Sequence, residues 1–301
     1  MATPDLIPPE VRARLKDLRL ASRRASTAQG IGQHLSRARG AGMEFAQYRA
    51  YEQGDEPRQI DWKLYARSDK FFVRESERDS PLTAWALLDA TASMAQADAL
   101  RPAWSRLQAA KAQAACLFEL ACRQGDRFGL IAVNGDGLTV VAAGQGNRHR
   151  DRCLLALAQV EAKGVWPDET VCRPIWERIR AGELALWLSD GFDETAVQLL
   201  ERLAAARREV LGVQLLTCEE RDFPFRGGHR FVDAEDGHEL LTDAPASRAE
   251  YLARFGAARR ALAARLAAAG IRHVEYVLDQ PLDAPLRRLF AQGKARFAEG
   301  A

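Results

Sequence analysis

The sequence of 301 residues lacks the features of secreted, membrane-spanning and strongly charged proteins. Met1 is followed by Thr3, Pro4 and Asp5 rather than by an apolar stretch with a cleavage site, which argues against a signal peptide. No apolar run is long enough to cross a bilayer, so no integral membrane segment is expected. The 43 basic and 41 acidic side chains leave a formal net charge of +2, which gives no general attraction to nucleic acid.

Paired cysteine motifs are also missing. The five cysteines are odd in number and show no C-x-x-C spacing. This pattern favours reduced thiols, and we therefore expect a cytoplasmic protein.

The sequence does not contain the motifs of common nucleotide-dependent or hydrolytic enzymes. There is no G-x-x-x-x-G-K-[ST] loop and no strand-linked G-x-G-x-x-G. Ser189 lies in W-L-S-D-G, which lacks the first glycine of a nucleophile elbow. The five histidines have no zinc-ligand spacing with each other or with the cysteines. These absences favour a non-enzymatic protein.

After Pro81, strand and helix patterns alternate, which predicts an α/β domain over residues 81–301 with a doubly wound, mainly parallel sheet. Segments such as AWALLD are apolar almost throughout, as expected for strands covered on both faces. The expected strands are 84–90, 127–134, 138–143, 183–189, 210–217 and 273–279. The expected helices lie near 101–123, 148–162, 170–181, 195–208, 246–269 and 283–297. A hairpin around Asp236-Gly237 is expected over 230–242.

Two shorter regions precede this domain. Residues 1–39 form a basic arm, in which apolar positions at helical spacing predict a helix over 8–30. We expect it to pack on the body, although a docking or membrane-surface helix is an alternative. Residues 40–80 combine glycine turns, aromatic residues and interleaved charges, which predicts a small β-rich module with a turn at Gly54-Asp55 and an edge strand after Phe71.

The strongest chemical signal is D-x-T-x-S at the end of the first strand of the α/β domain. Asp89 ends that strand, and the hydroxyls of Thr91 and Ser93 follow it. The loop leaving the carboxyl end of a central strand lies in the crevice where ligands bind in open α/β sheets. Residues two apart in an extended turn can direct their oxygens to one point, and a hard cation such as Mg²⁺ prefers oxygen ligands.

A second apolar strand ends in the same way, with Asp190 directly after Ser189. Thr170 lies at a helix start just before this strand. If the two strands are neighbours, these residues complete a metal-ligand set, which would comprise Asp89, Thr91, Ser93, Thr170 and Asp190. An ordinary helix-capping role for each of these residues is the alternative.

The D-x-T-x-S motif followed by a separate Thr and Asp resembles the metal-ion-dependent adhesion site of von Willebrand factor A domains, whose usual form is D-x-S-x-S, T, D. The departure is Thr91, which keeps the hydroxyl and adds a methyl group. The resemblance implies a von Willebrand factor A-like fold that binds Mg²⁺ or Mn²⁺ and contacts a partner through the metal.

The upstream segment G-D-x-x-R-x-I-D-W resembles the signature of a bacterial family of unknown function, number 58 in its catalogue. Members of that family are associated with MoxR-type AAA+ ATPases. The resemblance implies an adaptor or assembly factor whose partner is such an ATPase or a protein that it remodels. The signature residues could form a network that pins the small module to the α/β domain, or a partner surface; they are Asp55, Arg58, Asp61, Trp62 and Arg67.

Two other functions stay open at this point. A magnesium-dependent hydrolase could use Asp89 and Asp190, although related phosphatases require D-x-D and position 91 is Thr. The third possibility is a scaffold whose metal site is degenerate.

Overall fold

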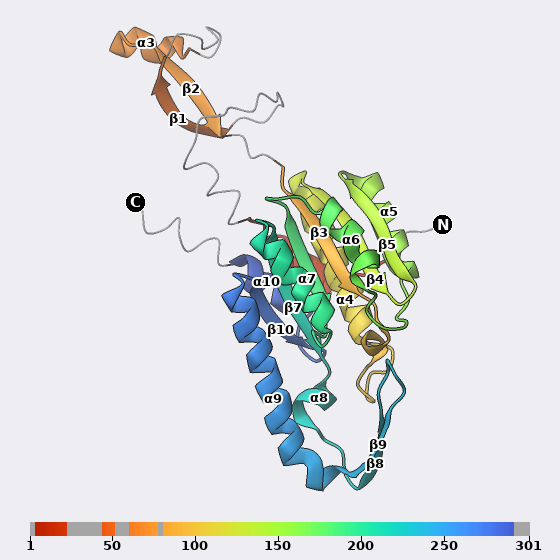
Figure 1. Ribbon diagram of the computed structural model, residues 1–301. Helices are drawn as coiled ribbons and strands as arrows, with labels where there is room; N and C mark the ends of the chain where they lie inside the picture. The colour runs from red at the N-terminus through yellow and green to blue at the C-terminus, as the bar shows by residue number, and fades with distance from the viewer. Residues whose placement is uncertain (1–3, 23–43, 52–59, 78–80, 292–301) are drawn as a thin grey trace. The chain divides into compact units, whose positions relative to one another are not determined.

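The computed structural model describes residues 4–22, 44–51, 60–77 and 81–291 (Figure 1). The chain divides into two compact units. The larger unit contains residues 1–30 and 82–301, and the smaller one contains residues 31–81.

The small unit is built on one antiparallel strand pair. Strand β1 (Glu44–Ala50) pairs with β2 (Phe72–Glu77), and helix α3 (Trp62–Ser68) lies between them in the chain. Asp61 caps α3, because its carboxylate accepts hydrogen bonds from the backbone amides of Lys63 and Leu64, at 3.0 and 3.1 Å. The expected strand after Phe71 is present, whereas the expected turn at Gly54-Asp55 lies outside the described residues.

The large unit contains a six-stranded sheet in the order β10-β7-β6-β3-β4-β5. All neighbours are parallel except β5, which is antiparallel to β4. Numbered along the chain, this is the doubly wound order 3-2-1-4-5-6, in which the winding reverses between the first and fourth strands. The predicted α/β fold class is therefore confirmed. The strands are β3 (Thr83–Asp89), β4 (Arg127–Asn134), β5 (Gly137–Gly144), β6 (Leu184–Ser189), β7 (Glu209–Leu216) and β10 (Arg272–Val277).

Helices cover both faces of this sheet (Figure 1). Strand β3 shows why: Ala86 and Leu88 pack into one core, and Trp85 and Leu87 pack into the other, so both faces are apolar. One face is covered by α4 (Arg106–Gln124), α5 (Asn147–Gln159) and α10 (Ala284–Ala291). The other is covered by α6 (Glu169–Arg178), α7 (Glu194–Ala205) and the end of α9 (Ala244–Ala268). None of the described helices is long and apolar enough to cross a membrane.

Between β7 and β10 the chain makes a long excursion away from the sheet (Figure 1). It contains α8 (Cys218–Asp222), the hairpin of β8 (Gly228–Val232) and β9 (Glu239–Asp243), and then α9. The hairpin confirms the prediction for 230–242. The short helix α8 and the 3-10 turn η2 (Ala92–Ala95) were not expected from the sequence.

The N-terminal segment differs from its prediction. Helix α1 (Pro9–Arg14) is much shorter than the expected helix over 8–30, and the described residues after it continue without helical structure to residue 22. Arg123 at the end of α4 donates to the carbonyls of Leu15 and Lys16, at 3.1 and 2.6 Å, so these carbonyls are engaged by the body of the protein. The tertiary contact replaces the helical hydrogen bonds that the sequence pattern predicts.

This segment also contributes to the hydrophobic core. Leu15, Leu18 and Leu20 are buried in the cluster that contains α4 and α10. The backbone of Leu20 exchanges two hydrogen bonds with the side chain of Gln124, at 2.7 and 3.2 Å. The segment is thus a structural part of the large unit.

We expect Leu15→Ala to lower the free energy of unfolding by about 2–5 kcal/mol, because Leu15 is fully buried and its truncation leaves a cavity. Urea unfolding followed by circular dichroism measures this change. The neighbouring variant Arg19→Ala is the control and should change stability by less than about 0.5 kcal/mol, because Arg19 is exposed. Equal effects of the two substitutions would contradict the packing of this segment.

Candidate metal centre

The predicted site residues gather at the carboxyl ends of β3 and β6, which are neighbours in the sheet. Asp89 is the last residue of β3, and Asp190 follows the last residue of β6. These two strands are the first and fourth of the doubly wound order, so the site lies at the topological switch point where such folds bind ligands.

Asp89 is a buried carboxylate held by hydroxyl and amide groups. Its exposed fraction is 1%; Oδ1 accepts hydrogen bonds from the amide and hydroxyl of Thr91 at 2.9 and 2.8 Å, and Oδ2 accepts one from the Ser189 hydroxyl at 2.6 Å. Burial, followed by the nearby carboxylate of Asp190, raises the pKa of Asp89 to about 7. The Asp89 carboxylate therefore lacks the compensating positive charge that would hold its pKa low.

Hydrogen bonds link the three side-chain oxygens of the D-x-T-x-S motif. Asp89 Oδ1 lies 2.8 Å from Thr91 Oγ1, which in turn lies 3.1 Å from Ser93 Oγ. Adjacent ligands of an octahedral Mg²⁺ ion, each about 2.0–2.1 Å from the metal, lie about 2.9 Å from one another. The two separations in the loop are close to this value, and they are also the lengths of ordinary hydrogen bonds.

Backbone contacts with a second loop fix this motif. The amide of Ala92 donates to the carbonyl of Gly164 at 2.7 Å, and the amide of Lys163 donates to the carbonyl of Ala90 at 2.8 Å. Gly164 has φ +63°, and a Cβ atom there would lie 2.8 Å from Cα of Gly135. A glycine is therefore required at position 164 for the second loop to pack this closely against the turn between β4 and β5.

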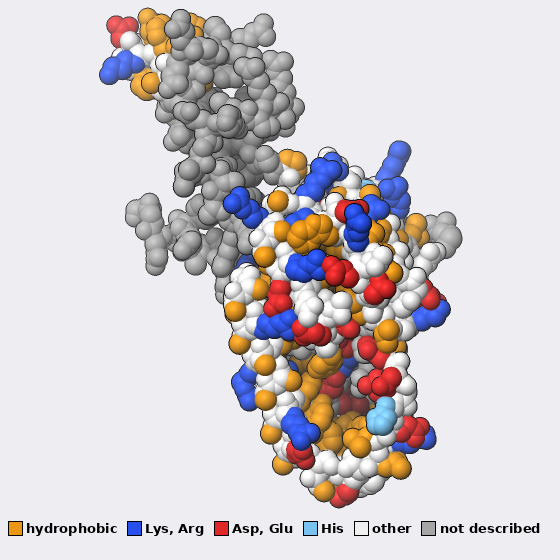
Figure 2. All heavy atoms as spheres, viewed as in Figure 1, with side chains coloured by type: hydrophobic (Ala, Val, Ile, Leu, Met, Phe, Trp, Pro, Cys, Tyr) orange, Lys and Arg blue, Asp and Glu red, His pale blue; other side chains and the backbone are white. Residues whose placement is uncertain are grey.

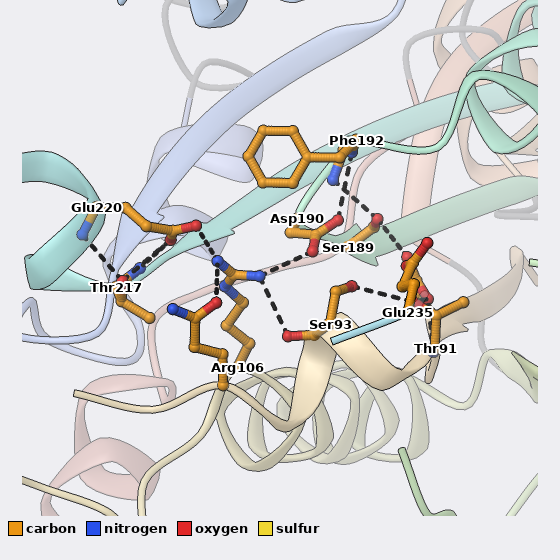
Figure 3. A network of polar contacts seen from close by, with 12 residues as sticks. Thr91, Ser93, Arg106, Ser189, Asp190, Phe192, Thr217, Glu220 and Glu235 are labelled. Atoms are coloured by element: carbon orange, nitrogen blue, oxygen red, sulfur yellow. Dashed lines mark hydrogen bonds and ion pairs between the residues drawn. The ribbon is translucent and has the colours of Figure 1, made fainter. Parts of the chain in front are cut away.

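Asp190 is paired with a buried arginine that sequence reasoning missed. Nη1 of Arg106 donates to Asp190 at 2.8 Å and to the carbonyl of Ser93 at 3.2 Å, while Nη2 donates to Gln96 at 3.2 Å and forms an ion pair with Glu220 (Figure 3). Arg106 is 1% exposed. One guanidinium thus joins the two loops of the site and also holds Glu220 against it.

A weak sequence signal for this arginine exists. Arg106 is the first residue of α4, directly after the capping residue Ser105, and it begins a helix that is otherwise largely buried. A buried guanidinium requires carboxylate partners, so its position predicts an ion pair but not the identity of the partners. The site role of Ser189 was also missed, because the sequence pattern marked only the aspartate that follows it.

Two glutamates from the excursion between β7 and β10 complete the polar network. Glu220 caps α8 in a reciprocal arrangement with Thr217 and meets Arg106 with its other oxygen. Burial, followed by the carboxylates of Asp190 and Asp193, raises the pKa of Glu235 in the turn of the β8–β9 hairpin, and the nearby Ser93 hydroxyl opposes this rise. Nothing in the local sequence around Glu235 distinguishes it from its acidic neighbours.

Thr170, the fifth predicted ligand, contacts different residues from the other four. It is exposed in the first turn of α6, where its amide donates to the capping carboxylate of Asp168 at 2.9 Å. Across the described part of the chain, no hydrogen bond joins Thr170 to Asp89, Thr91, Ser93 or Asp190. Its membership of the metal-ligand set stays a prediction.

An aromatic surface borders the polar network. Phe192, just after β6, is half exposed; its ring lies 6.1 Å from that of Phe255 in α9, and Phe255 stacks on Tyr251 at 5.4 Å. Figure 2 shows a hollow on this face, between α9 and the β8–β9 hairpin, with hydrophobic side chains on its floor and acidic side chains beside it. The candidate site therefore adjoins an apolar surface on the same unit.

The chemistry of the donor set suits a hard divalent cation. The proposed donors are hydroxyl and carboxylate oxygens, which hard cations prefer. Among the described residues no group of three His, Cys, Asp or Glu side chains is placed to bind a metal, so a metal shell here depends on the hydroxyls of Thr91 and Ser93. Among the ion pairs of those residues, only Arg106 meets the carboxylates of this network, which come from Asp89, Asp190, Glu220 and Glu235. A bound Mg²⁺ or Mn²⁺ ion would compensate the negative charge of these carboxylates that the Arg106 guanidinium alone leaves unbalanced.

The other predicted residues belong to the small unit. Asp55 and Arg58 lie outside the described residues. Asp61 caps α3, Arg67 is exposed in its last turn, and Trp62 is 58% exposed, with its ring edge against Tyr65 and Phe71. Their proposed roles in an interdomain network or a partner surface stay predictions.

Comparison with known proteins identifies relatives. Residues 47–261 match the family model described as "Protein of unknown function DUF58". The chain is 31% identical over 266 residues to the uncharacterized protein Mb1516 of Mycobacterium bovis and to the uncharacterized protein Rv1480 of Mycobacterium tuberculosis, and each match covers 87% of this chain and 82% of the relative. The family prediction drawn from the G-D-x-x-R-x-I-D-W segment is confirmed.

Solved structures with a similar fold include two proteins of low sequence identity. The conserved hypothetical protein BatB from Bacteroides thetaiotaomicron is 16% identical, with a TM-score of 0.44, over 73% of this chain and 100% of that one. The VWA domain of SpRpn10 is 12% identical, with a TM-score of 0.40, over 69% of this chain and 95% of that one.

We expect Asp89 to contribute a loss of stability to the metal-free protein as pH rises from about 4 to about 7. Within this window the native state retains a proton on Asp89 that the unfolded chain has released, because the native pKa is about 7 and the ordinary value is 3.8. The free energy of unfolding should then fall by up to about 1.4 kcal/mol per pH unit from this group. Urea unfolding in EDTA at several pH values measures the slope.

Asp89→Asn is the matched variant, because it keeps the shape of the side chain and cannot titrate. The unfolding free energy of the parent minus that of the variant should fall as pH rises over the same window. Identical slopes would show that Asp89 is ionised throughout and that its charge is already compensated.

Proposed function

We propose that this chain, which belongs to the DUF58 family of proteins of unknown function, is a non-enzymatic adaptor. It would bind a partner protein through a divalent metal ion. The observation that supports this proposal best is that the oxygens of Asp89, Thr91 and Ser93 lie together at the switch point of the sheet, with Thr91 Oγ1 2.8 Å from Asp89 and 3.1 Å from Ser93. The excess of buried carboxylate over positive charge at the same place is consistent with it.

The proposed ligands have different roles. Asp89, Thr91 and Ser93 would hold the ion from one loop, and Asp190 would approach it from the neighbouring strand, directly or through water. Thr170 remains the predicted fifth ligand. Mg²⁺ usually keeps several of its waters in proteins, so a partner carboxylate could replace one of them. The bound ion would supply this exchangeable coordination position.

The surface around the site suits a protein partner. A single carboxylate on a metal ion gives a small contact, whereas a stable protein interface buries a larger area with apolar side chains near its centre. The aromatic cluster of Phe192, Tyr251 and Phe255 offers such side chains, and it begins two residues after Asp190. By the family resemblance, the partner would be a MoxR-type AAA+ ATPase or a protein that it remodels.

A scaffold with a degenerate metal site is the second candidate, and one observation favours it. Arg106 already donates to Asp190 at 2.8 Å, so part of the negative charge is compensated without a metal ion. The hydrolase alternative gains less support, because the same ion pair engages Asp190, the second carboxylate that it requires.

Metal binding should stabilise the native protein. An ion that binds only the folded state adds about 2.7 kcal/mol at a hundredfold excess over its Kd, which corresponds to a rise of several degrees in Tm. We expect Mg²⁺ to raise the Tm of the parent and of Glu177→Ala, an exposed control in α6, but not that of Asp89→Ala. Differential scanning calorimetry measures all three, and the same rise in Asp89→Ala would remove Asp89 from the site.

Partner binding should depend on the metal. We expect the candidate ATPase to bind the parent in Mg²⁺ with an affinity at least about tenfold higher than in EDTA, which corresponds to about 1.4 kcal/mol. Ser93→Ala should weaken binding in Mg²⁺ while the circular dichroism spectrum stays unchanged. Calorimetric titration gives the affinities, and equal affinities in Mg²⁺ and EDTA would mean that this partner docks elsewhere.

A further inference from the structure

Most of helix α9 is poorly covered by the rest of the large unit. The helix is 25 residues long, and only Ala244 and Leu266, near its two ends, are buried. It runs from the β8–β9 hairpin back to the sheet (Figure 1). Helices in folded proteins are stabilised mainly by packing an apolar face against other elements. Among the described residues, the middle of α9 has little such packing.

A row of aromatic rings lies along this exposed part of α9. Tyr251 and Phe255 are four residues apart and therefore on one face of the helix, where their rings stack at 5.4 Å. Phe192, which is 51% exposed, extends the row toward the end of β6. At the other end, Phe223 lies 4.5 Å from Tyr251 and 5.7 Å from Phe231 of the hairpin. This aromatic row thus connects the hairpin, α9 and the end of β6.

The hairpin adds an apolar wall opposite α9. Leu240 pairs with Phe231 across the two strands, so both side chains lie on one face of the hairpin. Because Phe231 packs on Phe223, this is the face directed toward the aromatic row, yet Leu240 is 58% exposed. Leu241 pairs with Arg230 on the opposite face. Figure 2 shows the resulting hollow, with hydrophobic side chains on its floor and acidic side chains beside it.

The excursion that forms the hollow carries an excess of negative charge. Residues 217–243 contain eight acidic and three basic side chains, a formal net charge of −5, whereas the whole chain has +2. In the hairpin turn, the side chains of Asp233, Glu235 and Asp236 are exposed. Such a local field attracts a basic partner and repels acidic proteins and anionic lipid.

The arginines of α9 compensate little of this charge. Three of the five form ion pairs with other carboxylates of the unit, and these are Arg254, Arg259 and Arg265. A fourth, Arg248, donates to the carbonyls of Asp222 and Phe223 at the start of the excursion. The acidic excess therefore lies on the hairpin side of the hollow, and the aromatic row lies on the α9 side.

We propose that this hollow binds a basic amphipathic helix of the partner protein. Apolar side chains of such a helix recur at i and i+4, which matches the spacing of Tyr251 and Phe255, and its basic side chains would meet the carboxylates of the hairpin turn. This inference rests on the proposed function, because it names the chemistry of the partner that the adaptor binds. The contact itself requires no metal ion.

The test is a fluorescence anisotropy titration of the full chain, in EDTA, into a labelled leucine–lysine peptide. The peptide is about 18 residues long, which is about five helical turns, and its leucines recur at helical spacing. A leucine–glutamate peptide of the same pattern keeps the apolar face and reverses the charge. We expect the parent to bind the leucine–lysine peptide at least about tenfold more tightly than the leucine–glutamate peptide.

Two neighbouring hairpin variants separate the hollow from the rest of the surface. Leu240→Ser removes an apolar side chain from the hollow and should raise the Kd for the leucine–lysine peptide about tenfold. Leu241→Ser removes the same side chain from the opposite face and should leave the Kd unchanged. Because both leucines are exposed, the circular dichroism spectra of both variants should match that of the parent.

Each contrary result would overturn the inference. The absence of binding by the parent, or equal Kd values for the two hairpin variants, would mean that the hollow does not bind the helix. Equal affinities for the two peptides would contradict the role of charge. Sedimentation of the parent as a dimer that Leu240→Ser dissociates would assign the hollow to a second copy of this chain. Because EDTA is present, these results leave the metal-dependent function standing, and failure to bind Mg²⁺ would leave the hollow unaffected.

Discussion

The burial of negative charge where β3 and β6 end is the constraint on which the rest of this site depends. Asp89 and Asp190 are 1% and 2% exposed, and removing an ion from water costs several kcal/mol unless other groups compensate it. Hydroxyls and amides stabilise the first carboxylate, and Arg106 stabilises the second. The start of α4 places Arg106 beside these charges, and its guanidinium also donates to the carbonyl of Ser93 in the η2 turn and to Glu220 in α8.

Arg106 shows how one compensating group organises several elements. Its guanidinium contacts the η2 turn through Ser93, the end of β6 through Asp190 and helix α8 through Glu220. Glu220 in turn caps the helix that begins the excursion to the hairpin. The contacts that compensate the buried charges at the switch point therefore also hold the beginning of the segment that carries Glu235.

The sequence predicted those parts of the molecule that rest on local patterns. The apolar runs of β3 and β6 identify buried strands, and an aspartate at the end of each identifies the crevice. By contrast, the bonds of Arg106 to Asp190 and Glu220 join residues 84 and 114 positions apart, and no local pattern encodes such pairings. The helix expected over 8–30 was wrong in extent because contacts with α4 outweigh helical propensity.

The separation of the Arg106 contacts along the chain has a consequence for biosynthesis. Strands β3, β4 and β5 are contiguous in the chain and can pair as soon as they leave the ribosome, with Arg106 already in place between β3 and β4. Asp190 and Glu220 emerge only later. Until then, the guanidinium can donate to Ser93 and Gln96 but has no carboxylate from these positions, and burying its charge unpaired opposes premature closure of the nascent sheet around α4. Compaction of this end of the unit is thereby coupled to completion of β6 and β7 during translation.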